Sequence, residues 1–203
     1  MKPSILVSLA AGLFAALAGL AVVVKLGWLA RIDTAVAAWF GTHRSPTLAV
    51  ADAGAIYDFI GVPANFAIFA VVISMLLSLR ARSAIPFAAV IGAVVAAVAV
   101  KTALKALIER PPWTTEELKY LDDWTSNYLN WFPSGHIAGV SALLGMIAVC
   151  LATGSSRAFK VVLTSLVAAG VLFVALLAFY LGWHTFTDVL GGAILGGAIV
   201  SLG

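Results

Sequence analysis

Two residues near the C-terminus, His184 and Asp188, have types and spacing suited to chemistry on a phosphate group. Residues four apart on a helix lie about 40° from one another, on the same face. The carboxylate could then orient one imidazole nitrogen and leave the other as a base or nucleophile. The alternative is a structural pair at a helix N-terminus, where the helix dipole favours Asp. We favour chemistry, because ionisable residues in apolar surroundings are usually functional.

A second candidate is the tetrapeptide Pro133-Ser134-Gly135-His136, which opens an apolar run ending at Thr153. This junction predicts a helix start, with unpaired N–H groups and the positive end of the helix dipole. Ser134 is a strong N-cap type, and Gly135 lets a ligand approach the backbone. The alternative is an ordinary helix cap followed by an interfacial histidine.

The two candidates together resemble the layout of phosphoryl transfer. One histidine would attack phosphorus while the other, next to an anion-binding turn, protonates a leaving oxygen. Lys105 adds a cation, although lysines at the end of an apolar segment commonly extend to the membrane surface instead. We expect His136, His184, Asp188 and Lys105 to converge on one pocket.

The composition determines which elements must position these residues. Of 203 residues, 63% are hydrophobic and only 10% are charged, which indicates a polytopic membrane protein. The net charge of +3 comes from basic residues scattered around apolar segments, so it is a topology signal and indicates no nucleic-acid partner. The single Cys150 excludes an intrachain disulfide.

We predict an all-α fold in which residues 1–203 form a single membrane-embedded domain, a bundle of six transmembrane helices. Short amphipathic helices are expected at the interface between Lys25 and Phe59. Four glycines in the last span predict close helix packing: Gly191, Gly192, Gly196 and Gly197. The predicted spans are Ile5–Val24, Gly61–Leu79, Ala84–Ile108, Ser134–Thr153, Val161–Tyr180 and His184–Gly203.

The charged residues also predict an orientation. Six spans place both termini on one side with the turns at Arg80 and Arg157, and these segments are basic and contain no acidic residue. The positive-inside rule makes that side cytoplasmic. All nine acidic residues then fall on the opposite side with both candidate motifs. We therefore expect a plasma-membrane or inner-membrane protein whose site faces the periplasm or the cell exterior.

Other chemistries are less well supported by the sequence. No H-x-x-H, H-E-x-x-H or aspartate-rich motif is present and His43 has no evident partner, so we predict no metal site and no cofactor. Ser134 lacks the G-x-S-x-G context of a serine hydrolase nucleophile. A protein that binds or moves a lipid phosphate without cleaving it remains an open alternative.

These motifs give the chain a specific resemblance, from Asp33 onward, to the membrane branch of the type-2 phosphatidic acid phosphatase superfamily. The match comprises a Lys-initiated motif ending in Arg-Pro, the complete Pro133-Ser134-Gly135-His136, and a last motif containing His184 and Asp188. The resemblance implies that His184 forms a phosphohistidine, Asp188 orients it and His136 is the general acid. It further implies a set of phosphate-binding residues: Ser134, Gly135 and Lys105.

The chain departs from the family pattern at both arginines. Pro112 stands seven residues after Lys105, and Ala178 stands six before His184. A neutral side chain does not replace a bidentate guanidinium. Either Arg110 and Lys101 supply the positive charge from other positions, or the substrate is unusual, or catalysis is weak or absent.

The predicted function is an integral membrane lipid phosphatase, independent of metal, acting at the outer face through a phosphohistidine. Its partners would be membrane lipids and a lipid phosphate or diphosphate substrate, such as polyprenyl diphosphate or phosphatidylglycerol phosphate. The alternative is a catalytically altered relative that binds or transports a lipid phosphate.

Overall fold

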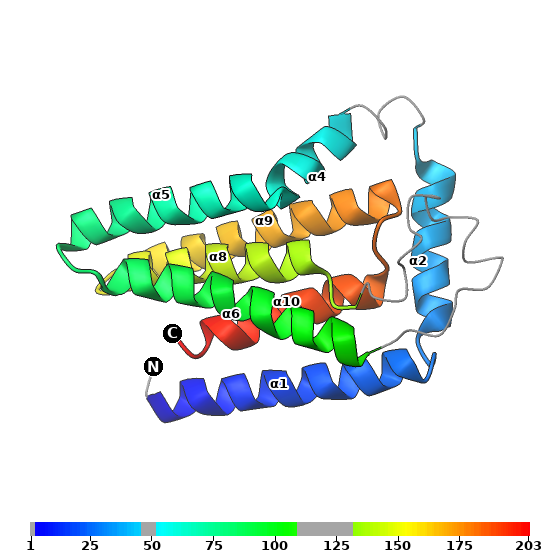
Figure 1. The fold of residues 1–203 in the computed structure, drawn as a ribbon, viewed down its shortest axis with the longest axis horizontal. Helices are drawn as coiled ribbons and strands as arrows, with labels where there is room; N and C mark the ends of the chain where they lie inside the picture. The colour runs from blue at the N-terminus through cyan, green and yellow to red at the C-terminus, as the bar shows by residue number, and fades with distance from the viewer. Residues whose placement is uncertain (1–2, 46–51, 109–131) are drawn as a thin grey trace.

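The computed structural model describes residues 3–45, 52–108 and 132–203, which fold into helices joined by short turns (Figure 1). Residues 109–131, with Arg110 and Pro112, lie outside these described residues. The helices are α1 (Pro3–Lys25), α2 (Ala30–His43), α4 (Gly54–Gly61), α5 (Pro63–Ala81), α6 (Ile85–Leu107), α8 (Gly135–Ala152), α9 (Arg157–Leu181) and α10 (Phe186–Val200).

Five of the described helices, α1, α5, α6, α8 and α9, are long and apolar enough to cross a membrane. The last predicted span differs. It was expected from His184 to Gly203, but α9 ends in a left-handed turn at Gly182 and α10 begins only at Phe186. Its 15 residues extend about 22 Å at ~1.5 Å per residue, which is less than the ~30 Å hydrocarbon core. The described part of the chain therefore contains five candidate spans and, in α10, a shorter apolar helix.

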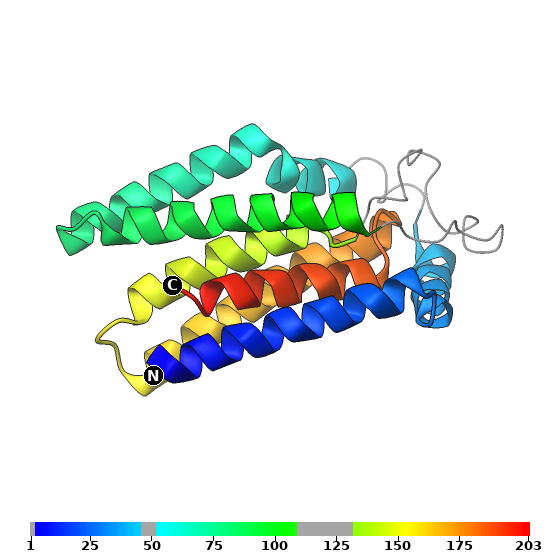
Figure 2. The ribbon, with the colours of Figure 1, turned by 60° about the horizontal axis from the view of Figure 1, so that its bottom comes forward.

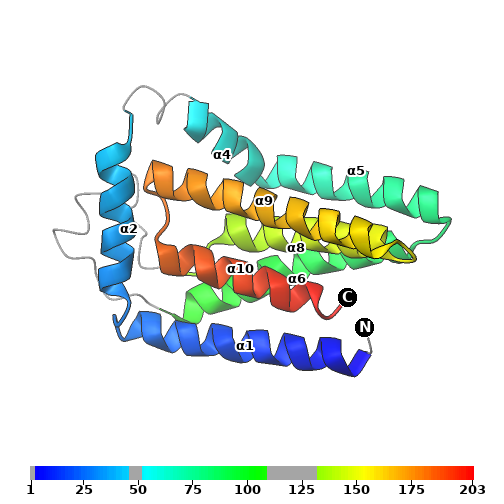
Figure 3. The same ribbon diagram turned by 180° about the vertical axis from the view of Figure 1, so that it is seen from behind.

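Successive long helices alternate in direction, and different turns and short helices lie at the two ends of the bundle (Figure 1). The start of α1, the C-terminus and the turns α5–α6 and α8–α9 lie at one end (Figure 1). The short helices α2 and α4 and the starts of α8 and α10 lie at the other, where α2 crosses the end of the bundle (Figures 1 and 3). Arg80 and Arg157 are thus separated from both candidate motifs by the length of the bundle.

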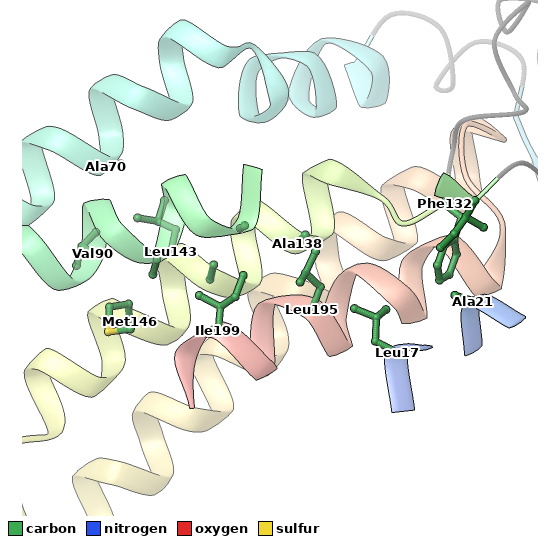
Figure 4. Close-up of a cluster of buried hydrophobic side chains, with 14 of the residues drawn as sticks. Leu17, Ala21, Ala70, Val90, Phe132, Ala138, Leu143, Met146, Leu195 and Ile199 are labelled. Carbon is green, nitrogen blue, oxygen red and sulfur yellow. The ribbon is translucent and has the colours of Figure 1, made fainter. Parts of the chain in front are cut away.

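The core is organised around α8, which packs on α10, α6 and α9, while α10 also packs on α1 (Figure 2). Apolar side chains from four of these helices meet in one cluster, shown in Figure 4, that includes Leu17, Val90, Ala138, Leu143, Met146, Leu195 and Ile199. This cluster joins the motif-bearing helices into one unit.

The sequence predicts close helix packing at four glycines of the last helix. The structure shows close contacts at three of them, and they let α10 lie close to α8 and to the residues before it. A Cβ on Gly192 would lie 2.6 Å from the Ser134 carbonyl oxygen, and one on Gly196 would overlap Ser141. A Cβ on Gly191 would similarly meet Phe132. Gly197 is different, because its nearest neighbour, Leu13 Cδ1, would lie at an ordinary 3.7 Å.

Candidate active site

The predicted helix start at Ser134 is present. Ser134 is the N-cap of α8, and its side chain accepts a hydrogen bond from the Ile137 N–H at 3.5 Å. The Ser134 N–H donates to the Asp188 carbonyl oxygen at 2.9 Å. Ser134 is fully buried. A main-chain hydrogen bond therefore joins the first turn of α8 to the first turn of α10.

His184 and Asp188 are close, but not for the reason that their spacing suggested. His184 lies in the turn before α10, so the two residues do not share a helical face. Thr185 is the N-cap and forms a capping box with Asp188, whose Oδ2 accepts from the Thr185 N–H at 3.0 Å and its hydroxyl at 2.9 Å. His184 Nδ1 lies 3.7 Å from the same Oδ2. The Asp188 carboxylate therefore both stabilises the start of α10 and faces the His184 imidazole.

His136 comes close to His184, as expected for a shared site. The two ring centroids are 6.4 Å apart. The His136 ring also packs against Tyr57, at a centroid distance of 4.3 Å, and lies directly over Gly61, where a Cβ would overlap it. Gly61 ends α4, so the α4–α5 junction determines the position of this imidazole.

Two lysines from α6 reach the same place. Lys101 and Lys105 line one cavity with His136 and His184. A Cβ on Gly135 would lie 3.0 Å from both Cδ and Nζ of Lys101. Gly135 therefore makes room for a lysine side chain beside the first turn of α8, where the sequence suggested close approach of a ligand. Two ammonium groups at a helix N-terminus form a strongly anion-attracting site.

The cavity has a volume of about 500 Å³ and two chemically different walls. The lysines and histidines form the polar part. The rest is apolar and comes largely from α5 and α6, with Phe66, Ala67, Val94, Ala97 and Val98. Such a cavity fits a molecule with an anionic headgroup and a hydrocarbon tail.

Asp33 is a buried carboxylate that lies outside both sequence motifs. It is only 1% exposed, and it accepts hydrogen bonds from the Thr187 N–H and hydroxyl, each at 2.8 Å. This contact connects α2 to the first turn of α10, beside Asp188. An acidic residue in the apolar segment Ala30–Phe40 was the available signal, because buried carboxylates require partners.

The described residues include one of the two positions where the family pattern has an arginine. Pro112 and the nearby Arg110 lie outside the described residues. Ala178 is fully buried, within an apolar cluster that includes Tyr57, Ile137 and Leu181. An arginine at 178 would therefore have to displace packed side chains.

The long apolar helices and the two linked helix starts are features of a polytopic membrane protein with a lysine-lined cavity at one end of the bundle. The PAP2 superfamily model matches residues 86–203, more than half of the chain, so the protein belongs to the PAP2 superfamily and is an integral membrane protein. No curated protein matches the chain.

The fold is also similar to a solved structure, that of the first transmembrane PAP2 type phosphatidylglycerolphosphate phosphatase from Bacillus subtilis. The TM-score is 0.76 at 21% sequence identity, and the match covers 94% of this chain and 92% of that chain. The shared fold therefore also includes most of the residues that precede the family-model match.

Proposed function

We propose that the protein is a lipid phosphatase that hydrolyses a lipid phosphate or diphosphate through a phosphohistidine, without a metal. The observation that carries this proposal is the single cavity in which His136, His184, Lys101 and Lys105 meet an apolar wall. The lysines and the start of α8 would bind the headgroup, and the apolar wall would hold part of the hydrocarbon chain.

The proposed reaction has two steps. The His184 nitrogen that does not face Asp188 attacks phosphorus, the P–O bond to the lipid breaks, and His136 donates a proton to the leaving oxygen. In the second step water attacks the phosphohistidine, His136 accepts its proton, and phosphate and the original His184 are released. The 6.4 Å between ring centroids leaves space for one phosphoryl group between the imidazoles. Lys105, Ser134 and the Gly135 N–H would bind the remaining oxygens, with Lys101 added to this set.

Phosphate release by the purified full-length protein tests this function. The substrates would be a short panel containing phosphatidic acid, phosphatidylglycerol phosphate and a polyprenyl diphosphate. Release should persist in the presence of a chelator and disappear in His184→Ala. The similarity to a phosphatidylglycerolphosphate phosphatase makes phosphatidylglycerol phosphate the first substrate to test.

We further propose that the site faces the periplasm or the cell exterior. Support comes from the basic turns at Arg80 and Arg157, which lie at the end of the bundle opposite the site. Single cysteines can be introduced at exposed Thr42, at the site end, and at exposed Ser156, in a Cys150→Ala background. A membrane-impermeant thiol reagent should label the first in intact cells and not the second. The reverse pattern would place the site in the cytoplasm.

The second candidate function is binding or transport of a lipid phosphate without hydrolysis. The observation in its favour is the apolar packing around Ala178, where the guanidinium of the family pattern would have to displace buried side chains. A transition-state arginine contributes on the order of 10³-fold or more in other phosphoryl-transfer enzymes. Binding of a lipid phosphate that weakens on Lys105→Ala, with no release by the wild type, would support this function over the phosphatase.

A further inference from the structure

Tyr57 lies beside the proposed phosphate site but outside the part of the chain that the family model matches. It is on α4, is 1% exposed and lines the cavity. Its ring contacts His136 at 4.3 Å and Trp183 at 5.2 Å between centroids. Packing on two rings fixes the direction of the phenol.

The Tyr57 hydroxyl is buried and makes no hydrogen bond with any residue that the structure describes. The Ser134 side chain is near enough to the Tyr57 hydroxyl to influence its pKa. However, no hydrogen bond of acceptable geometry joins the two side chains. A buried hydroxyl without a partner is unfavourable, and such groups in native proteins call for an explanation. Because this one belongs to a residue that lines the cavity, a bound ligand can provide the missing acceptor.

The protonation state of Tyr57 suits a donor. Burial raises the pKa of the phenol above its usual range, the carboxylates of Asp188 and Asp58 add to this shift, and Ser134 opposes it. The hydroxyl therefore keeps its proton at neutral pH and can donate a hydrogen bond to an anionic oxygen.

The surroundings indicate which acceptor that is. Tyr57 packs in the same buried cluster as Ala178, which supplies no donor. The cavity that Tyr57 lines is also lined by Lys101, Lys105 and the start of α8, all of which attract anions. We propose that the Tyr57 hydroxyl is a phosphate-binding group, which donates a hydrogen bond to a phosphoryl oxygen of the substrate at the start of α8. This inference rests on the proposed function, since it assigns a further residue to the same site.

Tyr57→Phe tests the inference, because it removes one oxygen and keeps the ring against His136. We expect inorganic phosphate to bind roughly 10- to 100-fold more weakly to this variant, as measured by isothermal titration calorimetry on the full-length protein in detergent. The kcat/KM for phosphatidic acid should fall by a similar factor. The thermal unfolding midpoint without phosphate should be unchanged or higher, since an unpaired buried hydroxyl is lost.

Tyr180→Phe is the matched control. The Tyr180 hydroxyl accepts from the Ser45 N–H at 3.0 Å, and Tyr180 does not line the cavity. Its removal should leave phosphate affinity unchanged and lower the unfolding midpoint slightly.

The outcomes separate this inference from the proposed function. Equal phosphate affinity in Tyr57→Phe and the wild type would overturn the role of Tyr57, even if both hydrolyse lipid phosphates. Weakened phosphate binding in Tyr57→Phe, with no hydrolysis by the wild type, would keep the role of Tyr57 and overturn the phosphatase. A wild type that neither binds phosphate nor releases it would overturn both.

Discussion

The α8–α10 pair, with the turn that precedes α10, and the α4–α6 side of the molecule lie on two sides of the same cavity but are built differently. The first turns of α8 and α10 are held by side-chain caps, a main-chain hydrogen bond and glycine contacts. The α4–α6 side supplies Tyr57, Gly61 and the lysines, together with the apolar wall of the cavity. The α8–α10 pair is tightly packed, and we call it the frame. The α4–α6 side forms the opposite wall of the cavity.

This difference assigns different roles to the two regions. Residues of the α8–α10 pair are positioned by local rules of helix capping, so their geometry depends on a few neighbouring residues. Residues of the α4–α6 side are positioned by packing between distant segments. Substitutions in the frame should therefore affect stability and chemistry together, whereas substitutions opposite it should affect substrate binding or ring placement with smaller changes in stability.

The largest expected effect is on the reacting group itself. His184→Ala should reduce phosphate release by on the order of 10³-fold or more, because no other described side chain is placed to attack phosphorus with a carboxylate behind it. The thermal unfolding midpoint should change little, since His184 precedes the capped helix. Measurable turnover near the wild-type rate would contradict the phosphohistidine.

The next effect tests the frame by adding one methyl group. Gly192→Ala places a Cβ 2.6 Å from the Ser134 carbonyl oxygen and 2.9 Å from Ile137 Cβ. We expect a loss of about 1–3 kcal/mol of stability from overpacking, accompanied by a clear fall in activity. Gly197→Ala is the control on the same helix, because its new methyl meets only Leu13 Cδ1 at 3.7 Å. Similar unfolding midpoints for the two variants would show that α8 and α10 are not held this closely.

A third substitution tests the opposite side. Gly61→Ala would overlap the His136 ring, and rotation of the imidazole should lower kcat by roughly 10- to 100-fold. Gly92→Ala, on α6, serves for comparison because a Cβ there meets nothing within 4 Å. The expected signature is a fall in kcat for Gly61→Ala with an unfolding midpoint near that of Gly92→Ala. A large loss of stability instead would mean that Gly61 belongs to the frame.

The smallest effect concerns Asp33, which links α2 to the frame. Asp33→Asn keeps the size of the side chain but weakens the two hydrogen bonds from Thr187, so stability should fall by about 1–2 kcal/mol. The kcat should fall several-fold while KM changes little, because Asp33 positions α10 and does not line the cavity. Exposed Asp52→Asn provides the comparison. Unchanged kcat in Asp33→Asn would leave this carboxylate with a purely structural role.

The residues that the sequence identified are largely those of the frame. Ser134 was predicted as a helix cap because Pro-Ser-Gly-His precedes an apolar run, and capping is a local property. The proximity of His184 and Asp188 was predicted, but through a shared helical face that is absent. The left-handed turn at Gly182 and the Thr185 cap delay the start of α10, and the capping box brings the same two side chains together.

The residues that the sequence did not identify lie mainly on other helices. Tyr57, Gly61 and Asp33 contact the site only because α2 and α4 fold over the end of the bundle, and no spacing in the sequence encodes those contacts. Lys101 was visible as a charge, but the choice between the membrane surface and the cavity depends on how α6 packs beside α8. Contacts between distant segments therefore could not be predicted from the sequence, whereas local motifs could.

The hydrogen bond from the Ser134 N–H to the Asp188 carbonyl oxygen has an evolutionary consequence. Since it joins main chain to main chain, mutation of either side chain does not by itself remove it. A lineage can therefore inherit the relative position of these two helix starts while the ligand-binding side chains around them are exchanged. The absence of arginine from positions 112 and 178, in a chain whose cavity is lined by Lys101, Lys105 and Tyr57, is the kind of divergence that such a backbone permits.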